Sequence, residues 1–239
     1  MNTKLSYICF RMLKNHMKNK QYILLVALSM LFVTITQAQH KSYNIKNGFG
    51  VGGGISMFNI KTDNFTTTQG NGFVVSLNAS VDIPNRWYNV SYGMQISEST
   101  LEISGRMTDD VAGNEQIEYK LMAAQLGFLF HAKIIGNNFT LDAGPQLQYN
   151  GDLDLKNSQQ EDYYVNGYDD LSASDITEMS KFNINGAVGA TAGLGPLRVR
   201  AQYIYGFLNM FNKLNNNLDY GSTFKGNPET IMLTAIFTF

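Results

Sequence analysis

The sequence predicts an all-β fold: an eight-stranded antiparallel up-and-down transmembrane β-barrel with short periplasmic turns and long extracellular loops. Three observations lead to this prediction. Apolar and polar residues alternate with period two over long stretches, short and long connections alternate between those stretches, and the apolar faces are nearly uninterrupted and end in aromatic residues. Composition agrees, because charged residues make up 15% of the 239 residues, against roughly 25% in soluble domains.

The N-terminus has the three parts of a secretory signal peptide. Three lysines precede an apolar run over residues 22–35, and a small-x-small cleavage pattern ends at Ala38. The run is short for a membrane span, and an uncleaved anchor or a buried helix is the alternative interpretation. The long leader makes Met12 and Met17 alternative starts of translation. The expected organisation is a signal peptide over 1–38 that is cleaved near 38/39, a short periplasmic segment over 39–47, and the outer-membrane barrel over 48–239.

Charge and cysteine content argue against several classes of function. The formal net charge is −1, so nothing favours nucleic acid as a partner. The only cysteine, Cys9, precedes the apolar run. The exported chain is therefore expected to lack a disulfide framework, a Cys-based zinc site and thiol catalysis.

Eight stretches show the alternation. It is clearest in "ETIMLTAIFTF", where Leu233 and Phe237 lie on a wholly apolar face and Thr234 and Thr238 lie on the other. Each stretch is long enough to cross a bilayer at a tilt, which takes roughly 9 to 11 residues. The expected strands are 48–59, 71–83, 87–100, 117–132, 138–150, 181–194, 196–207 and 229–239.

The connections indicate the topology. "PNR", "KIIGN" and "GP" are short, and they alternate with longer connections over 60–70, 101–116, 151–180 and 208–228. In an up-and-down barrel, alternate connections lie at the same end. All the short turns therefore fall at one end and all the long loops at the other, as in outer-membrane barrels.

The direction of the two faces decides between a membrane barrel and a soluble one. A secreted lipocalin-like barrel that carries a small apolar ligand has the same period with its apolar side buried. The membrane interpretation predicts that Leu141, Val199 and Leu233 face lipid while Gln146 and Gln202 face the lumen.

Several short motifs resemble a known family. The signal ends in "TQAQ", the first strand is "GFGVGGGIS", a later segment reads "LGPLRVRAQYIYGF", and the chain ends in Phe239. Over residues 45–239 the chain resembles the outer-membrane β-barrel proteins of Bacteroidota, the PorT-like group. The resemblance implies insertion by the barrel-assembly machinery, with the terminal aromatic residue as part of the sorting signal. Some members of the group assist protein secretion, and the resemblance transfers no catalytic residue.

The glycines of the first strand also fit a second pattern. Residues 48–53 match the G-x-G-x-x-G loop of dinucleotide-binding folds. That loop requires a preceding strand and a following helix, whereas here a signal peptide precedes it and a strand follows. We interpret Gly50, Gly52 and Gly54 as one face of a bent barrel strand.

The lumen is expected to hold a polar plug. An eight-stranded barrel has an interior just wide enough for its own side chains. Asp82, Asp142, Arg198 and Arg200 fall on inward positions near the turn end, where opposite charges attract strongly. The alternative is that each of these groups is solvated separately at the rim.

No catalytic, cofactor-binding or metal-binding residue is expected. A lipid-modifying barrel enzyme, similar to the lipid A deacylase, would need Ser, His and an acid on its outer half. His131 lies beside a short turn, so we interpret it as an interfacial polar residue. Glu98 and Glu102 are expected near a solvated external loop.

The segment 151–180 is acidic and contains tyrosines. We expect it to be a solvated loop that forms, with 208–228, an external interaction surface. Its acids match no EF-hand spacing. The expected function is a non-enzymatic outer-membrane barrel with a structural, adhesive or secretion-accessory role, in contact with membrane lipid and a protein partner. The candidate interaction residues are Tyr163, Tyr164, Tyr168, Asp169 and Asp170.

Overall fold

The computed structural model describes residues 46–108, 113, 115–177, 179–217 and 223–239, so the expected signal peptide and most of the short segment after it lie outside the described residues. These described residues contain nine strands, of which eight are long. They are β1 (Lys46–Lys61), β2 (Thr67–Asp82), β3 (Tyr88–Arg106), β4 (Glu115–Ile135), β5 (Phe139–Leu155), β6 (Tyr164–Val165), β7 (Phe182–Leu194), β8 (Leu197–Gly206) and β9 (Asn227–Thr238).

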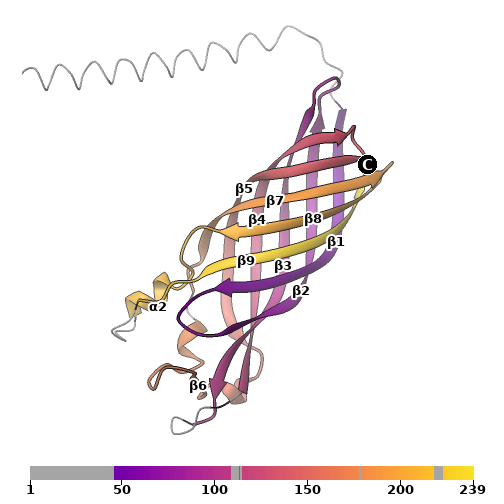
Figure 1. Cartoon of the computed structure of the whole chain (residues 1–239). Coiled ribbons are helices and arrows are strands. Elements are labelled where there is room, and N and C mark those ends of the chain that lie inside the picture. Colours follow the sequence, from indigo (N-terminus) through magenta and orange to yellow (C-terminus); the bar gives the residue numbers. More distant parts are fainter. Residues whose placement is uncertain (1–45, 109–112, 114, 178, 218–222) are drawn as a thin grey trace, which may run out of the picture. The chain divides into compact units, whose positions relative to one another are not determined.

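The eight long strands close into a ring in which every neighbouring pair is antiparallel (Figure 1). Each long strand pairs with the next long strand along the chain, and β1 pairs with β9 to complete the ring. The register at this closure runs from Gly50 opposite Thr238 to Lys61 opposite Asn227. The predicted eight-stranded up-and-down barrel is confirmed, and β6 is a two-residue addition to the end of β3.

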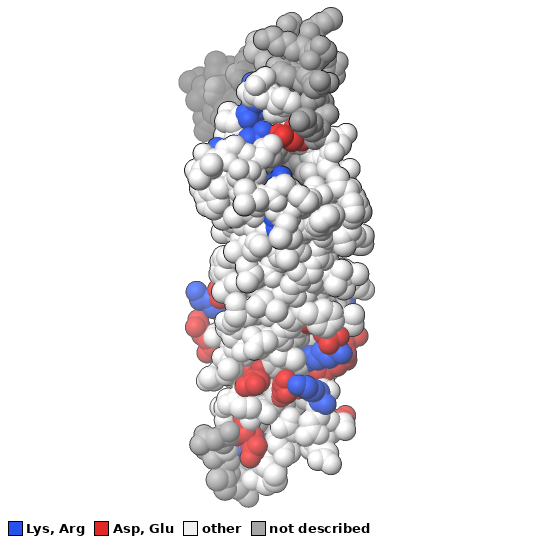
Figure 2. Space-filling model, turned by 90° about the vertical axis from the view of Figure 1, so that its right-hand side faces the viewer, with Lys and Arg blue, Asp and Glu red and all other residues white. Residues whose placement is uncertain are grey.

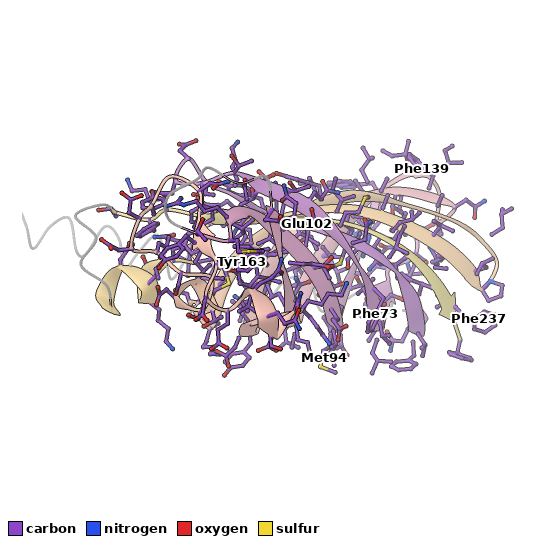
Figure 3. The ribbon with its side chains drawn as sticks, turned by 90° about the horizontal axis from the view of Figure 1, so that it is seen from below. Phe73, Met94, Glu102, Phe139, Tyr163 and Phe237 are labelled. Carbon is purple, nitrogen blue, oxygen red and sulfur yellow. The ribbon has the colours of Figure 1, made fainter. Side chains whose placement is uncertain are left out.

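The predicted direction of the two faces is also confirmed. Leu141, Val199 and Leu233 are 45–49% exposed, whereas Gln146 and Gln202 are 3% and 4% exposed. Each long strand contributes exposed apolar side chains to a belt around the outside, and Figure 3 shows Phe73, Met94 and Phe237 pointing away from the barrel. The apolar belt consists of Phe49, Val51, Ile55, Phe73, Val75, Leu77, Tyr92, Met94, Ile96, Met122, Leu126, Phe128, Leu141, Leu147, Tyr149, Phe182, Ile184, Val188, Val199, Tyr203, Ile231, Leu233 and Phe237.

The three short turns lie at one end of the barrel, which we call the turn end. They connect β2 to β3, β4 to β5 and β7 to β8. Each contains a residue in the left-handed backbone region: Asn85 at φ 63°, Gly136 at φ 51° and Gly195 at φ 60°. Tight hairpins require such a residue, and glycine and asparagine adopt this conformation most readily.

At the opposite end, the loop end, several connections differ from the prediction because the strands extend into them. The segment 60–70 was expected to be long, but β1 and β2 continue into it and leave only 62–66 between them. The reason is packing, because Ile60 and Phe65 are buried in an apolar cluster at this end. The strands β3, β4 and β5 extend beyond the expected bounds for the same reason, since Leu101, Ile117 and Leu153 belong to that cluster.

The glycines of β1 lie within a continuous strand, which excludes the dinucleotide-binding loop. They make room at the closure of the ring. A Cβ on Gly54 would lie 1.9 Å from the Leu233 carbonyl oxygen, and a Cβ on Gly52 would lie 2.7 Å from Ser76 Oγ. The two neighbouring strands approach β1 so closely at these positions that only glycine fits.

Within the described part of the chain, helical structure lies at the loop end. It consists of two short 3₁₀-helices, η2 (Ser158–Gln160) and η3 (Asp175–Thr177), and the helix α2 (Asn212–Asn217). Within the described residues, no helix has the length and hydrophobicity that a membrane crossing requires.

Candidate functional site

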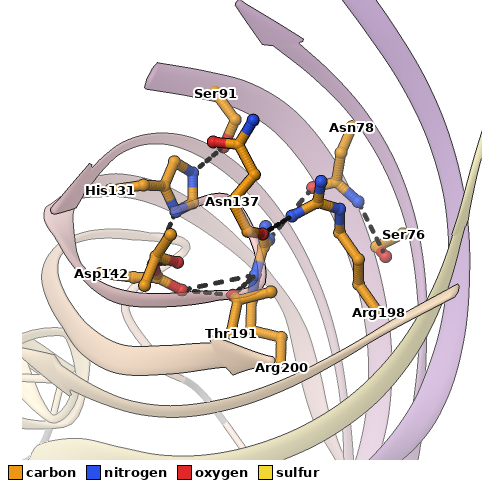
Figure 4. Close-up of polar contacts among 10 residues, drawn as sticks. Ser76, Asn78, Ser91, His131, Asn137, Asp142, Thr191, Arg198 and Arg200 are labelled. Carbon is orange, nitrogen blue, oxygen red and sulfur yellow. Dashed lines mark hydrogen bonds and ion pairs between the residues drawn. The ribbon is translucent and has the colours of Figure 1, made fainter. Parts of the chain in front are cut away.

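The turn-end half of the lumen contains a network of buried polar side chains centred on Asp142 (Figure 4). Asp142 lies on an inward position of β5 and is 3% exposed. One carboxylate oxygen accepts hydrogen bonds of 2.6 Å from Thr140 Oγ1 and from His131 Nδ1. The other accepts a hydrogen bond from the Thr191 hydroxyl. Buried carboxylates need such partners, because the loss of hydration is otherwise uncompensated.

His131 joins this carboxylate to a serine on the neighbouring strand. Its Nε2 lies 2.7 Å from Ser91 Oγ, and Ser91 and His131 are 3% and 5% exposed. Three adjacent strands, β3, β4 and β5, therefore place a serine, a histidine and an aspartate in one hydrogen-bonded row. The interpretation of His131 as an interfacial polar residue is wrong, because the side chain points into the lumen.

The four residues of the predicted plug all lie in this half of the lumen. Arg200 Nε lies 3.8 Å from the Asp142 carboxylate and 3.1 Å from Thr191 Oγ1. Asp82 forms an ion pair with Lys133 and accepts a hydrogen bond of 2.7 Å from Asn137 Nδ2.

The side chain of Arg198 contacts the same group of residues at a main-chain oxygen. It donates a hydrogen bond of 3.0 Å to the Asn137 carbonyl. The structure thus pairs Asp142 with Arg200, while Asp82 and Arg198 meet at Asn137, a residue of the β4–β5 turn. Lys133 was not among the predicted residues, although its inward position is readable from the alternation of β4.

The lumen is filled by side chains. Three cavities inside the barrel have volumes of about 80, 20 and 10 Å³, and the largest of these has space for only a few water molecules. A chain of amides also crosses the lumen, in which Gln125 accepts from Gln95 and donates to Gln148 at 2.7 Å.

A larger hollow lies outside the barrel. It has a volume of about 640 Å³ and is lined mainly by residues of the apolar belt, among them Leu77, Tyr92 and Phe128. Its position within the belt makes it a lipid-facing groove under the membrane interpretation.

At the loop end, the loops fold inward over an apolar cluster and form a cap. We call this cap the crown; it consists of the described residues of the segments 62–66, 156–181 and 207–226, that is, without 178 and 218–222. Buried apolar side chains from all three segments meet inward-facing residues of the strands. The cluster consists of Phe58, Ile60, Phe65, Leu101, Ile103, Ile117, Tyr119, Leu121, Leu153, Val165, Leu171, Ala173, Ile176, Met179, Met210, Phe211, Leu214 and Phe224.

Two polar side chains of the barrel wall fix the longest crown segment. Arg106, at the end of β3, is 5% exposed and donates to the carbonyls of Val165 at 3.1 Å and Tyr168 at 2.8 Å. Tyr119 donates a hydrogen bond of 2.9 Å to the Ala173 carbonyl.

The tyrosines of the crown contact the rest of the crown and the barrel. Tyr163 and Tyr168 pack against the apolar cluster, Tyr168 also donates to the Asn64 carbonyl at 3.2 Å, and Tyr164 lies under the Arg106 guanidinium at 5.7 Å. Asp169 is exposed and pairs with Arg106 at 3.1 Å. The expectation of a solvated loop is therefore wrong for its apolar and aromatic residues and holds for exposed acids such as Asp170.

The outer surface of the crown has a polar hollow of about 440 Å³. It lies between the β1–β2 connection and the segment before β9. Its lining residues are Lys61, Thr62, Asp63, Asn64, Tyr205, Thr223, Lys225 and Asn227.

Charged residues mark the loop-end edge of the apolar belt. Glu98 pairs with Lys120 at 2.9 Å and Glu118 pairs with Lys156 at 2.7 Å, and Figure 2 shows charged side chains toward the two ends of the barrel with a largely uncharged zone between them. Glu98 and Glu102 lie in β3 and not in a loop. Among the described residues, no group of three or more His, Cys, Asp or Glu side chains is arranged to hold a metal ion.

Comparison with known proteins gives no family. No protein-family model matches the chain, and no curated protein matches it. Among solved structures, the neisserial surface protein A is similar at 12% identity and a TM-score of 0.46, over 80% of this chain and 97% of that one. The outer membrane protein Ail of Yersinia pestis is similar at 15% identity and a TM-score of 0.37, over 81% and 100% of the two chains. The translocator domain of the autotransporter NalP from Neisseria meningitidis is similar at 10% identity and a TM-score of 0.26, over 92% and 98%.

Sequence reasoning missed Ser91 altogether. A signal existed, because Ser91, His131 and Asp142 all occupy inward positions of three consecutive strands close to the turn end. The register that aligns them depends on how far each strand is shifted against the next, and the alternation alone does not specify that shift.

Proposed function

We propose that this protein is an outer-membrane β-barrel whose crown is an interaction surface, with a structural, adhesive or secretion-accessory role. The observation that carries the proposal is the combination of a closed ring with an apolar outer belt and a polar, filled lumen. A barrel with this arrangement is stable in a bilayer, where lipid covers the apolar side chains. Because the lumen is filled, the proposed role depends on binding at an end of the barrel.

The crown is the end built for binding. Its loops are held by buried hydrogen bonds and an apolar cluster, so a partner would meet a preformed surface and little conformational entropy would be lost on association. The surface offers a polar hollow beside Lys61 and Lys225 and exposed acids at Asp169 and Asp170.

A secretion-accessory role is the variant of this proposal that the resemblance to the PorT-like group favours. The features behind it are the glycine-rich first strand and the terminal Phe239. Insertion by the barrel-assembly machinery through that C-terminus, and export through a cleaved signal peptide, are parts of the same proposal.

Membrane fractionation followed by affinity capture tests the proposal. Recovery in the outer membrane, with a heat-modifiable gel shift, is expected. A captured partner should be lost from the double variant Lys61→Glu, Lys225→Glu in the crown hollow and retained by Ile135→Lys, a control at the exposed turn end. Recovery in the soluble periplasmic fraction would contradict the membrane assignment, and equal capture by both variants would contradict the role of the hollow.

A further inference from the structure

The row of Ser91, His131 and Asp142 has the connectivity of a nucleophile, a general base and an orienting acid. An ionised carboxylate only accepts hydrogen bonds, so the 2.6 Å contact requires His131 Nδ1 to carry the proton. In the neutral imidazole, Nε2 is then the acceptor for the Ser91 hydroxyl at 2.7 Å. This is the arrangement by which histidine removes a proton from serine.

The acid is held in place from several directions. Thr140, Thr191 and Arg200 all contact the Asp142 carboxylate, which leaves it little freedom to rotate away from the imidazole. Such support is what a catalytic row needs if its geometry is to be fixed before a substrate binds.

Ser91 borders two cavities at once. The cavity of about 20 Å³ is lined by Gly93, Gly127 and Leu129, among others, and has room for a methyl-sized group. The cavity of about 80 Å³ is polar and extends to the turn end, where Asn137 and Arg198 line it. An ester whose small acyl group enters the first cavity would leave its alcohol part in the second.

A free hydrogen-bond donor faces the smaller cavity. Gln202 is 4% exposed, and its Nε2 has no hydrogen-bond partner. Buried donors without partners are unusual and costly in folded proteins. Because Gln202 and Ser91 line the same small cavity, this donor is available to a carbonyl oxygen that becomes negatively charged during attack by Ser91.

We propose that the lumen contains a serine-hydrolase site that cleaves small acyl esters, with acetyl esters as the substrate class. It is independent of the interaction surface at the crown, and it differs from an enzyme acting on lipid A because the site faces the lumen at the turn end. In this site Ser91 is the nucleophile, His131 the general base, Asp142 a positioning residue and Gln202 the oxyanion donor.

The reaction balances with water as the only co-reactant. Ser91 Oγ forms a bond to the acetyl carbonyl carbon and gives its proton to His131 Nε2. The ester C–O bond breaks, the leaving alkoxide takes that proton and departs as an alcohol, and acetyl-Ser91 remains. Water then adds to the acetyl carbon while His131 accepts one of its protons, and the Ser91–acetyl bond breaks with that proton returned to Oγ. The product is acetic acid, which gives its remaining proton to solvent and leaves as acetate.

Methanesulfonyl fluoride tests the site, because it is small enough for these cavities. Attack by Ser91 Oγ forms an O–S bond and releases fluoride, and mass spectrometry of peptides from the full-length folded barrel locates the adduct. We expect modification of Ser91, with the buried lumen serine Ser97 of the same strand unmodified as an internal control. A folded wild-type barrel in which Ser91 stays unmodified would overturn the proposal.

Ethyl acetate hydrolysis, followed as acetate release, is the second readout. Ser91→Ala should abolish the activity, and His131→Ala and Asp142→Asn should each lower it by about 10²-fold or more. Gln202→Leu should lower it by about 10²-fold, whereas Ser97→Ala should retain it. An unchanged rate in Ser91→Ala would show that the row is only structural. Should the His131 or Asp142 variants fail to fold, the selective modification of wild-type Ser91 over Ser97 still decides the question.

Discussion

Arg106, the last residue of β3, donates a hydrogen bond of 2.8 Å to the main-chain carbonyl of Tyr168, so a strand of the barrel wall holds the longest segment of the crown. Arg106 is 5% exposed, and its guanidinium also donates a hydrogen bond to the Val165 carbonyl. Hydrogen bonds from a charged donor to buried acceptors stabilise more than neutral ones.

Arg106→Met should therefore loosen the crown without opening the barrel. We expect a local loss of about 1.5–3 kcal/mol, seen as faster proteolysis within residues 156–181, with the heat-modifiable gel shift preserved. Lys156→Met is the matched control, because its pair with Glu118 is exposed and contributes no more than about 1 kcal/mol. Equal protease resistance of wild type and the Arg106 variant would show that the cluster alone holds the crown.

Gly54 tests the closure between β1 and β9. A Cβ at this position would lie 1.9 Å from the Leu233 carbonyl oxygen, so Gly54→Ala must push the two strands apart. We expect destabilisation of about 1–3 kcal/mol or more and a smaller folded fraction on gels run without heating. Gly53→Ala is the control, since its Cβ would meet nothing closer than the Val74 carbonyl oxygen at 3.8 Å. Normal folding of Gly54→Ala would mean that the register at the closure is wrong.

Val188 tests the apolar belt. It is 55% exposed on the outer face of β7, in the middle of that strand, so Val188→Arg places a charge against lipid. The expected cost is about 2–4 kcal/mol near the bilayer midplane, measured as a shift of the urea midpoint for folding into vesicles. Leu194→Arg, beside a short turn and 78% exposed, should cost about 1 kcal/mol or less because interfaces tolerate arginine. An equal loss of folding free energy at the two positions would contradict the assignment of the apolar belt to the bilayer.

Substitution of Phe239 tests whether the terminal aromatic ring acts in insertion into the membrane or in the stability of the folded barrel. The residue is 74% exposed, and its main-chain N–H donates to the Phe49 carbonyl at 2.7 Å, so Phe239→Ala removes little packing and keeps the hydrogen bond. We expect slower insertion in cells, measured by pulse-chase folding, with unchanged stability after refolding in detergent. Phe239→Tyr should insert normally. A variant that is unstable in detergent would show that the ring has a structural role.

The sequence was sufficient to predict the barrel because each strand separates two environments. Leu233 and Thr234 alternate in β9 as they do in the printed sequence, and exposure follows the same order. The alternation is weakest in β4, where residues 121–130 are nearly all apolar, and the structure gives the cause. Its inward residues Leu121 and Leu129 belong to apolar parts of the lumen, so both faces of the strand are apolar there and the alternation is lost.

The crown and the lumen site were less predictable, because they depend on contacts between residues distant in sequence. Arg106 meets Tyr168 only after the loop folds back over the barrel, and no local pattern encodes that path. Ser91, His131 and Asp142 meet through the stagger between strands. Asp142 and Arg200 were expected near each other from their inward positions alone, and the structure pairs them.

The amide chain through Gln95, Gln125 and Gln148, together with the apolar cluster above it, crosses the full interior. A conductance measurement tests this directly. A planar bilayer that contains the protein should show no single-channel current steps under an applied voltage. Passage of ions or nutrients is then not the expected contribution of this molecule, which leaves binding at its ends and the proposed ester chemistry in its lumen.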